Sequence, residues 1–251
     1  MMYHPTLDKL QQLKLTGMLR ALQEQEAVPD IRTMPFEERL GLMVDRELTD
    51  RDNRRMQTRL RAAKLKQGVA LEDIDFKSAR GLDRSLIMKL AGCEWVAEHL
   101  NVLITGATGV GKTFLACALA HKACREGYSS YYVRLSRLFQ DLDVGRADGR
   151  YAKMMRQMAK ADVIVMDDWG LAVLNDQHRR DLLEILDDRY NLRATVITSQ
   201  LPIAHWHEAV GDPTLADAIL DRVVHNAYKI NLSGKTMRKE IEKLTTDRTK
   251  P

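Results

Sequence analysis

The stretch NVLITGATGVGKTFLACALA, residues 101–120, decides the fold. A short apolar run typical of a buried strand leads into a glycine-rich loop, and the residues after the loop have the apolar spacing of a helix. Residues 106–113 match the pattern G-x-x-x-x-G-K-[ST] at every defined position. Glycines let the backbone curl so that successive N–H groups face a phosphate, and the helix N-terminus adds positive potential. The stretch therefore predicts a phosphate-binding loop between a strand and a helix.

The side chains of this loop indicate a nucleotide. Lys112 is expected to reach the β- and γ-phosphates, and the Thr113 hydroxyl is expected to ligate Mg²⁺. Because no N-K-x-D sequence follows a late strand, guanine specificity is unsupported and we expect ATP. A second GKT occurs at 234–236, but Lys229 stands where the first glycine would be needed, so a second loop is rejected. The predicted nucleotide-binding residues are Gly106, Ala107, Thr108, Gly109, Val110, Gly111, Lys112, Thr113 and Phe114.

A pair of carboxylates follows a second apolar run. The sequence VIVMDDWG, residues 163–170, reads as a buried strand that ends in Asp167 and Asp168. The strand end brings Asp167 near Thr113, so we expect these two residues to hold Mg²⁺. Asp168 is the candidate group that polarises the attacking water. Many P-loop ATPases have glutamate at that position, and aspartate is shorter by one methylene.

The wider pattern predicts an α/β fold with a five-stranded parallel sheet flanked by helices. Apolar, β-rich runs alternate with helical segments, as in parallel sheets that are covered on both faces. Expected domains are a small all-helical N-terminal domain (1–66), a connector (67–100) and an ATPase domain (101–251) with a C-terminal helical lid at 235–246. Expected strands are 101–105, 129–133, 163–167, 194–199 and 227–230, with helices at 112–126, 134–142, 149–160, 175–190 and 214–226.

Composition sets looser bounds on function. The 251 residues carry a net charge of +4 and have a pI of about 8.9, which only hints at an anionic partner. Apolar runs are too short to span a membrane, and three cysteines without a C-x-x-C pair argue against zinc. These features favour a reducing, cytoplasmic location and no membrane partner.

Four further polar residues are candidates for catalysis. Ser199 and Gln200 end the fourth predicted strand, where a polar side chain can contact the γ-phosphate or the attacking water. Arg222 lies near the end of the helical stretch DPTLADAILDRVVH, and Arg238 lies in SGKTMRK. Alternative interpretations remain: Arg222 as an ion-pair partner of Asp217 or Asp221, and Arg238 as part of a solvated basic helix.

These sequences, in this order, resemble the IstB family. GATGVGKT, VMDDWG, TSQLP, GDPTLADAILDRVVH and SGKTMRK carry the resemblance, which covers the whole chain. Members of that family are AAA+ ATPases that assist the transposase of bacterial insertion sequences, and they are close relatives of DnaC-type helicase loaders. The resemblance implies a P-loop AAA+ core and agrees with aspartate at position 168.

The resemblance also implies roles for these four residues. Ser199 or Gln200 would be the sensor 1 residue, and the choice between them stays open. Arg222 matches the arginine finger that reaches the ATP of a neighbouring subunit, and Arg238 matches the sensor 2 residue. A guanidinium acting in trans makes hydrolysis depend on assembly, so an ATP-dependent oligomer is expected.

A basic stretch suggests a second ligand. Residues 51–66, RDNRRMQTRLRAAKLK, read as an amphipathic helix with a guanidinium-rich face. Arginine binds phosphate oxygens bidentately, and no base-reading motif is visible, so we expect largely sequence-neutral, salt-dependent contact with duplex DNA. A solvated basic face is the alternative; Arg146, Arg150 and Lys153 are weaker DNA candidates. The predicted DNA-binding residues are Arg51, Arg54, Arg55, Arg59, Arg61, Lys64 and Lys66.

Three functions compete on this evidence. The first is an AAA+ ATPase that binds duplex DNA in an ATP-dependent manner, assembles on it and assists a cognate transposase in target selection and transposition. The second is a replicative helicase loader, whose core would be nearly the same and whose partner would be a hexameric helicase. The third is a small-molecule P-loop kinase, which would need neither Arg222 nor DNA. We expect the first.

Overall fold

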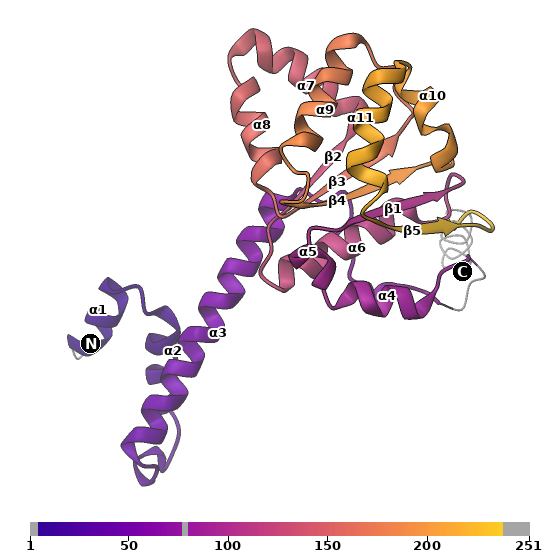
Figure 1. Cartoon of the computed structure of the whole chain (residues 1–251). Helices are drawn as coiled ribbons and strands as arrows, with labels where there is room; N and C mark the ends of the chain where they lie inside the picture. Colours follow the sequence, from indigo (N-terminus) through magenta and orange to yellow (C-terminus); the bar gives the residue numbers. More distant parts are fainter. Residues whose placement is uncertain (1–4, 77–79, 238–251) are drawn as a thin grey trace, which may run out of the picture. The chain divides into compact units, whose positions relative to one another are not determined.

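The computed structural model describes residues 5–76 and 80–237 (Figure 1). It divides into two compact units, Met1–Thr58 and Arg59–Pro251. Within the described residues no helix is both long and apolar enough to cross a bilayer.

The second unit is built on one parallel sheet. Its strands run in the order β2-β3-β4-β1-β5, and every neighbouring pair is parallel. The five-stranded parallel sheet predicted from the sequence is confirmed, with strand bounds that differ by at most two residues at either end. The strands are β1 (Asn101–Gly106), β2 (Ser130–Arg134), β3 (Val163–Trp169), β4 (Ala194–Ser199) and β5 (Ala227–Leu232).

Apolar side chains on both faces explain why these runs form central strands. Along β1, Val102 and Ile104 belong to one core cluster and Leu103 belongs to the other, and all three are fully buried. A strand buried on both faces needs a continuous apolar run, since successive side chains point to opposite sides. β1 lies between β4 and β5 and runs parallel to both. The loop that follows β1 therefore begins between the carboxyl ends of these two strands.

Helices cover the two faces of the sheet (Figure 1). The core cluster that contains Val102 includes residues of three helices, and the cluster that contains Leu103 includes residues of five. The first face is covered by α4 (Arg84–Ala91), α5 (Glu94–Ala97) and α6 (Lys112–Arg125). The opposite face is covered by α7 (Leu135–Asp148), α8 (Tyr151–Lys160), α9 (Asp176–Asp187), α10 (Trp206–Val210) and α11 (Pro213–Val224).

Short 3₁₀ turns complete this unit at Leu71–Asp73 (η2) and Ile203–His205 (η3).

The first unit is helical, as predicted. Its elements are α1 (Pro5–Gln12), α2 (Thr16–Glu26), a 3₁₀ turn (η1, Ile31–Thr33) and the greater part of α3 (Phe36–Ala63). Gly17 lets α2 approach α3 closely, because a Cβ atom there would lie 2.6 Å from Cα of Glu47. The Gly17 N–H donates to Oε2 of the buried Glu47 at 2.7 Å, which satisfies one of the unpaired donors at the start of α2.

The structure differs from the expected organisation at two boundaries. The division between the units falls inside α3, between Thr58 and Arg59, rather than after residue 66. The expected connector, 67–100, belongs to the second unit, where Ile87, Leu90 and Trp95 are buried in its core. These side chains therefore fold with the sheet and do not form a linker.

The basic helix also ends earlier than predicted. α3 stops at Ala63, and Lys64 has a positive φ of 50°, a backbone conformation that cannot continue a right-handed helix. Lys64 and Lys66 consequently lie beyond the helix that carries the arginines. The prediction of one continuous helix over 51–66 was therefore wrong for these two residues. Of the lid helix expected at 235–246, residues 235–237 are not helical, and residues 238–246, which include Arg238, lie outside the described residues.

Candidate nucleotide site

The glycine-rich loop joins β1 to α6 at the carboxyl edge of the sheet. Gly106, Gly109 and Gly111 have φ values of 145°, 86° and 100°, a region that favours glycine. Space is restricted as well: a Cβ atom on Gly106 would lie 2.1 Å from the carbonyl oxygen of Leu232, and one on Gly109 would lie 2.1 Å from Oγ1 of Thr236. Only glycine therefore fits at these two positions.

Lys112 curls back over this loop from the first turn of α6. Its Nζ donates to the carbonyl oxygens of Gly106 at 2.7 Å and Ala107 at 2.8 Å. The side chain is 7% exposed, so the ammonium group is held within the loop rather than in bulk water. This position suits the predicted contact with phosphate, because a partly desolvated charge interacts more strongly with an anion.

Asp167, at the end of β3, is the most fully engaged side chain of the site. Its Oδ1 accepts from Oγ1 of Thr113 at 2.8 Å and from Oγ1 of Thr198 at 2.5 Å. Its Oδ2 accepts from the Tyr132 hydroxyl at 2.5 Å and lies 3.5 Å from Nζ of Lys66. The two predicted Mg²⁺ ligands, Asp167 and Thr113, are thus in direct contact.

The contacts of Asp167 keep the carboxylate ionised. Burial alone raises its pKa, but hydrogen bonds from Thr198, Tyr132 and Thr113, together with the charge of Lys66, outweigh burial and leave the pKa below its ordinary value. The Tyr132 pKa is raised by burial and by the hydrogen bond to Asp167. A buried carboxylate beside a hydroxyl provides the hard oxygen ligands that Mg²⁺ prefers, so the residues present fit this ion.

Asp168 faces the same cleft because β3 is irregular at this point. The register with β4 shifts between Met166 and Trp169, and Asp168 has a φ of 64°. Such a bulge redirects a side chain that regular alternation would send to the opposite face. Oδ2 of Asp168 lies 2.7 Å from Nε of Arg134, the last residue of β2, and its N–H donates to Thr198 Oγ1 at 3.2 Å.

The structure separates Ser199 from Gln200, which the sequence left as alternatives. The Ser199 hydroxyl is fully buried, donates to the carbonyl oxygen of Trp169 at 2.9 Å and accepts from the N–H of Leu201 at 3.0 Å. Gln200 instead lines the nucleotide cleft, and its Oε1 accepts from the Thr108 hydroxyl of the loop at 2.6 Å. Gln200 is therefore the residue of this pair that can face a nucleotide.

These residues surround a cleft of about 350 Å³. Its walls come from the glycine-rich loop, the ends of β2, β3 and β4, and the segment that follows α3. Residues lining it are Lys66, Gln67, Thr108, Gly109, Gly111, Lys112, Thr113, Phe114, Arg134, Asp168, Leu171, Gln200 and Met237.

Four residues of this site were missed from sequence: Lys66 as a cleft residue, Tyr132, Arg134 and Thr198. Arg134 and Thr198 lie at or one residue from the carboxyl ends of β2 and β4, which is the signal that also identified Asp167 and Gln200. Tyrosine and threonine are common in strands, so the residue types of Tyr132 and Thr198 did not indicate a polar role in the site. Lys66 was predicted only as a DNA-binding residue of the basic stretch 51–66.

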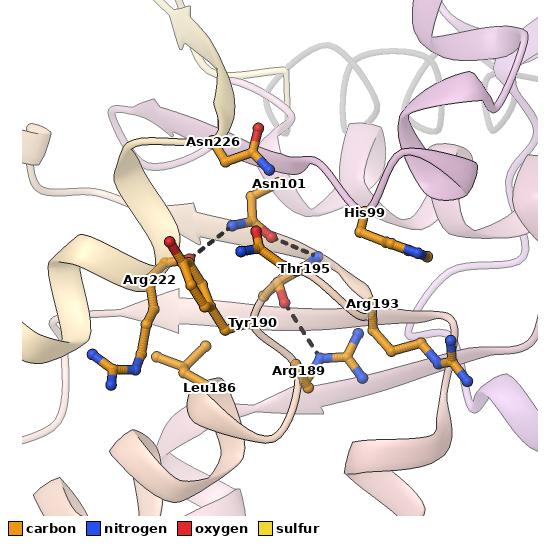
Figure 2. A pocket seen from close by; sticks show the side chains of 10 residues that line it. His99, Asn101, Leu186, Arg189, Tyr190, Arg193, Thr195, Arg222 and Asn226 are labelled. Atoms are coloured by element: carbon orange, nitrogen blue, oxygen red, sulfur yellow. Dashed lines mark hydrogen bonds between the residues drawn. The ribbon is translucent and has the colours of Figure 1, made fainter.

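Arg222 lies beside the first residue of β1, at the end of that strand opposite to the glycine-rich loop, and Figure 2 shows it next to Asn101. Its carbonyl oxygen accepts from Nδ2 of Asn101, the first residue of β1, at 3.1 Å. The glycine-rich loop follows the last residue of that six-residue strand, so roughly 20 Å of strand separates the two within one chain. An arginine side chain cannot bridge that distance, and Arg222 does not contribute to the nucleotide site of its own chain.

The Arg222 side chain is held by another helix. Its Nε lies 2.6 Å from Oδ1 of Asp187 at the end of α9, and Nη1 donates to the carbonyl oxygen of Ala218 at 2.7 Å. The expected alternative pairing with Asp217 or Asp221 is not formed, because these carboxylates lie beside His207 and His225.

A buried arginine lies near Arg222. Figure 2 shows Arg189 directed at Thr195, with Nε to Oγ1 at 3.3 Å. Arg189 also donates to the carbonyl oxygens of Met158 and Ala161, and burial, together with the charge of Arg193, lowers its pKa to about 9. Its hydrogen bonds tie α8 to β4, so its role is structural.

The arginines predicted to bind DNA fall into two groups. Arg51, Arg54 and Arg55 belong to the first unit, where Arg51 pairs with Glu47 at 2.7 Å and Arg55 lies 3.6 Å from Asp52. All three keep between 45% and 70% of their side chains exposed. The pair of Arg55 with Asp52 is exposed on both sides and contributes about 0–1 kcal/mol, so a phosphate can replace Asp52, whereas the Glu47 partner of Arg51 and Arg54 is buried.

The second group belongs to the second unit and is less uniform. Arg59 donates through Nε to the carbonyl oxygen of Cys124 at 2.9 Å, and Nζ of Lys64 lies 5.8 Å from the ring centre of Tyr131. Arg61 is exposed on the last turn of α3. Lys66 lies in the nucleotide cleft, so its assignment to the DNA-binding face does not match its surroundings.

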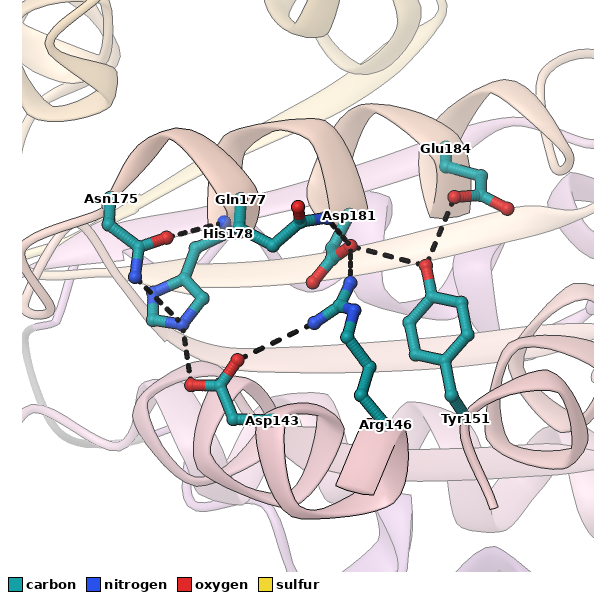
Figure 3. A network of polar contacts seen from close by, with 8 residues as sticks. All are labelled: Asp143, Arg146, Tyr151, Asn175, Gln177, His178, Asp181 and Glu184. Atoms are coloured by element: carbon teal, nitrogen blue, oxygen red, sulfur yellow. Dashed lines mark hydrogen bonds and ion pairs between the residues drawn. The ribbon is translucent and has the colours of Figure 1, made fainter. Parts of the chain in front are cut away.

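The weaker DNA candidates Arg146 and Arg150 are engaged in ion pairs, and Figure 3 shows those of Arg146. Arg146 contacts the fully buried Asp181 of α9 and lies 3.5 Å from Asp143, while its guanidinium lies over the Tyr151 ring at 4.3 Å. This network joins α7, α8 and α9, so Arg146 holds helices together. Arg150 pairs with Asp148 at its own helix start, and Lys153 is exposed.

The strand order, the loop after β1 and the paired aspartates at the end of β3 define an AAA+ P-loop nucleotide-binding protein. The family model described as IstB-like ATP binding protein matches residues 8–245. The chain therefore belongs to the IstB-like ATP-binding protein family, as its resemblance predicted.

Curated relatives carry consistent names. The chain is 52% identical over 239 residues to the putative insertion sequence ATP-binding protein y4pL of Sinorhizobium fredii, which covers 95% of this chain and 98% of the relative. It is 33% identical over 232 residues to the insertion sequence IS21 putative ATP-binding protein of Pseudomonas aeruginosa, covering 92% and 86%.

Solved structures agree on the fold. A crystal structure of DnaI has a TM-score of 0.57 at 24% identity and covers 66% of this chain and 91% of its own. A crystal structure of the DnaC helicase loader has a TM-score of 0.57 at 23% identity, covering 68% and 99%. At these identities the likeness establishes the AAA+ fold alone.

Proposed function

We propose that this protein is a Mg²⁺-dependent ATPase that assembles on duplex DNA and assists a transposase in target selection and transposition. Membership of a family whose relatives are named insertion sequence ATP-binding proteins supports the transposition role. The observation that carries the proposal is a nucleotide cleft lined by Lys112, Thr113 and Asp168, together with an arginine finger candidate, Arg222, at the other end of β1.

The ATPase chemistry follows from the cleft. Lys112 and the loop N–H groups bind the phosphates, and Asp167 with Thr113 holds Mg²⁺. Mg²⁺ bound there neutralises charge on the phosphate oxygens. Asp168 accepts the proton of the attacking water, and Gln200 contacts the γ-phosphate as the sensor 1 residue. Arg238 is retained as the sensor 2 candidate from the resemblance alone.

Self-association would bring Arg222 of one copy to the nucleotide of another. Since Arg222 is too far from the glycine-rich loop of its own chain, its guanidinium stabilises phosphoryl charge in the site of a neighbouring copy. ATP then promotes an oligomer, and hydrolysis weakens it. The geometry favours this reading over a small-molecule kinase, which completes its site within one chain.

DNA contact is proposed for the exposed arginines of α3. Arg51, Arg54, Arg55 and Arg61 are exposed along this helix, and guanidinium groups bind phosphate without reading base sequence. Binding is therefore largely sequence-neutral and weakens steeply with salt.

A helicase loader is the second candidate. The likeness of the fold to the DnaC helicase loader favours it, although the named insertion-sequence relatives are far more similar in sequence. The two functions differ in the preferred nucleic acid and in the protein partner.

Binding to labelled duplex and to single strands of equal length, each with ATP and with ADP, tests the proposal. We expect ATP to drive large assemblies on duplex and ADP to leave weak binding. Pull-downs with the cognate transposase and with the host helicase give the second readout. ATP-dependent preference for single strands, with capture of the helicase, would replace the transposition role with the loader role.

A further inference from the structure

We propose that Lys66 and Mg²⁺ exclude each other at Asp167, so that Lys66 is a positioning residue that sets how much Mg²⁺ the protein needs to bind nucleotide. The inference rests on the proposed role of Asp167 as Mg²⁺ ligand. Nζ of Lys66 lies 3.5 Å from Oδ2 of Asp167, and Lys66 lines the same cleft as Lys112 and Thr113.

The first argument is the capacity of the carboxylate. Two carboxylate oxygens offer about four acceptor positions. Oδ1 of Asp167 accepts from Thr113 and Thr198, and Oδ2 accepts from Tyr132 and pairs with Lys66. Since Asp167 is fully buried, these protein groups supply its partners. A metal ion that binds Asp167 directly must displace at least one of them.

Lys66 is the partner that leaves most easily. The three hydroxyl contacts measure 2.5–2.8 Å, whereas the ammonium is 3.5 Å away. Lys66 has 44% of its side chain exposed, so its charge is resolvated when it moves. It is also the one cationic partner among the four, and a divalent cation repels it at this range while the hydroxyl groups stay neutral.

The backbone of this segment is held in place while the side chain can swing. Burial raises the pKa of the Cys117 thiol, and hydrogen bonds from the backbone of Gln67 and Lys66 partly offset that rise, so both residues contact α6. Leu65 packs against the core, and Nζ of Lys64 lies over the Tyr131 ring. Displacement of Lys66 is therefore a side-chain movement at the end of the segment that joins α3 to the sheet.

Lys66→Met and Lys66→Gln test the exclusion. The readout is the Mg²⁺ concentration at half-maximal binding of a fluorescent ADP analogue, which involves no hydrolysis. We expect both substitutions to lower this midpoint by about three- to fivefold, the range that corresponds to a partly exposed ion pair. Lys66→Arg keeps the charge and should keep the wild-type midpoint. Lys64→Met, two residues away and outside the cleft, is the matched control and should leave it unchanged.

A second readout distinguishes exclusion from damage to the fold. The rise in Tm that Mg²⁺ with ADP produces should be larger in Lys66→Met than in the wild type, because the competing cation has been removed. In an Asp167→Asn background the effect of Lys66→Met on the midpoint should disappear.

An unchanged or raised midpoint in both uncharged variants, with Tm values near that of the wild type, would overturn the inference. If the wild-type protein binds the ADP analogue without any dependence on Mg²⁺, the assignment of Asp167 and Thr113 as metal ligands fails instead. The two failures are therefore distinguishable.

Discussion

Arg134 and Asp168 form an ion pair at the wall of the nucleotide cleft, with Nε of Arg134 2.7 Å from Oδ2 of Asp168. The pair joins the end of β2 to the irregular end of β3, and Asp168 is the proposed proton acceptor in hydrolysis. A carboxylate oxygen bound to a guanidinium is less available to a water molecule. The first prediction follows from this contact.

Arg134→Ala should raise ATP hydrolysis measured without DNA. Arg134 is 53% exposed, so the pair is worth up to about 1 kcal/mol, which corresponds to roughly a fivefold change. Asp168→Asn should abolish hydrolysis in either background and leave binding of an ADP analogue intact. A fall in the basal rate of Arg134→Ala would instead indicate that Arg134 assists the reaction.

Arg222→Ala should lower hydrolysis by about 10³-fold or more, the contribution of an arginine finger, while nucleotide binding by the isolated subunit stays unchanged. Mixing this variant with an equally inactive Lys112→Ala protein provides the test of action in trans. Where the two variants meet in the mixture, the Arg222→Ala protein can provide an intact glycine-rich loop and the Lys112→Ala protein an intact Arg222. Part of the activity should therefore return. Arg193→Ala, at the same edge of the sheet, is the control. Lack of recovery in the mixture would exclude a shared site.

Thr198→Val should destabilise the protein by about 1–3 kcal/mol, since it removes a buried hydroxyl that donates to Asp167 and accepts from the N–H of Asp168. Urea unfolding measures the change. Thr198→Ser keeps a hydroxyl and should retain most of the wild-type stability. A loss of stability in the Ser variant together with wild-type stability in the Val variant would show that the methyl group, rather than the hydrogen bonds, is what matters.

Arg55→Ala and Arg61→Ala should each weaken duplex binding and reduce the slope of log K against log salt by about one, as expected for one lost phosphate contact. Lys153→Ala, an exposed cation on α8, should leave the slope unchanged. Arg59→Ala should mainly lower Tm, because its guanidinium donates to the carbonyl oxygen of Cys124. The proposed face is wrong if Lys153→Ala lowers the slope and the two α3 variants do not.

The N-terminal unit should lose stability in acid through Glu47. Burial raises the Glu47 pKa, but hydrogen bonds from Arg51, Gly17 and Met18 outweigh burial and hold the pKa below its usual 4.5. A carboxyl group with a lowered folded-state pKa stabilises the fold above pH 4.5, and this contribution is lost as the pH falls towards the folded-state value.

Hydrogen exchange of the Gly17 amide across pH 6 to 3, corrected for intrinsic rates, measures this effect. Protection should decrease with acidity in the wild type and should be low and nearly independent of pH in Glu47→Gln. A parallel decrease in the variant would assign the effect to another group.

Local signals explain what the sequence predicted well. The glycine-rich loop and the pair Asp167–Asp168 are contiguous motifs beside strands that are apolar on both faces, so their positions follow from short-range rules. Thr198, Tyr132 and Arg134 act through contacts with residues about 30 positions or more away, and each looks like an ordinary strand residue. No local pattern marks such residues.

The end of α3 shows a different limit. Alanine, lysine and leucine after Arg61 all favour helix, so propensity predicted a continuous helix through Lys66. Tertiary contacts decide otherwise: Ala63 is buried, Lys64 turns with a positive φ, and Leu65 packs against the core. The same turn delivers Lys66 to Asp167, which is why a residue predicted to bind DNA lies in the nucleotide cleft.

The separation of Arg222 from the glycine-rich loop determines how many nucleotide clefts lack an arginine in an oligomer of this protein. Each copy has its own nucleotide cleft at the carboxyl ends of the strands and the guanidinium of Arg222 near their amino ends. With the guanidinium serving the adjacent copy, an open filament always has one terminal cleft that lacks its arginine, whereas a closed ring has none. Under the proposed function, turnover per subunit would rise with filament length and would be lowest for the shortest assemblies, so nucleotide would be retained longest at one terminus and the filament would be chemically polar.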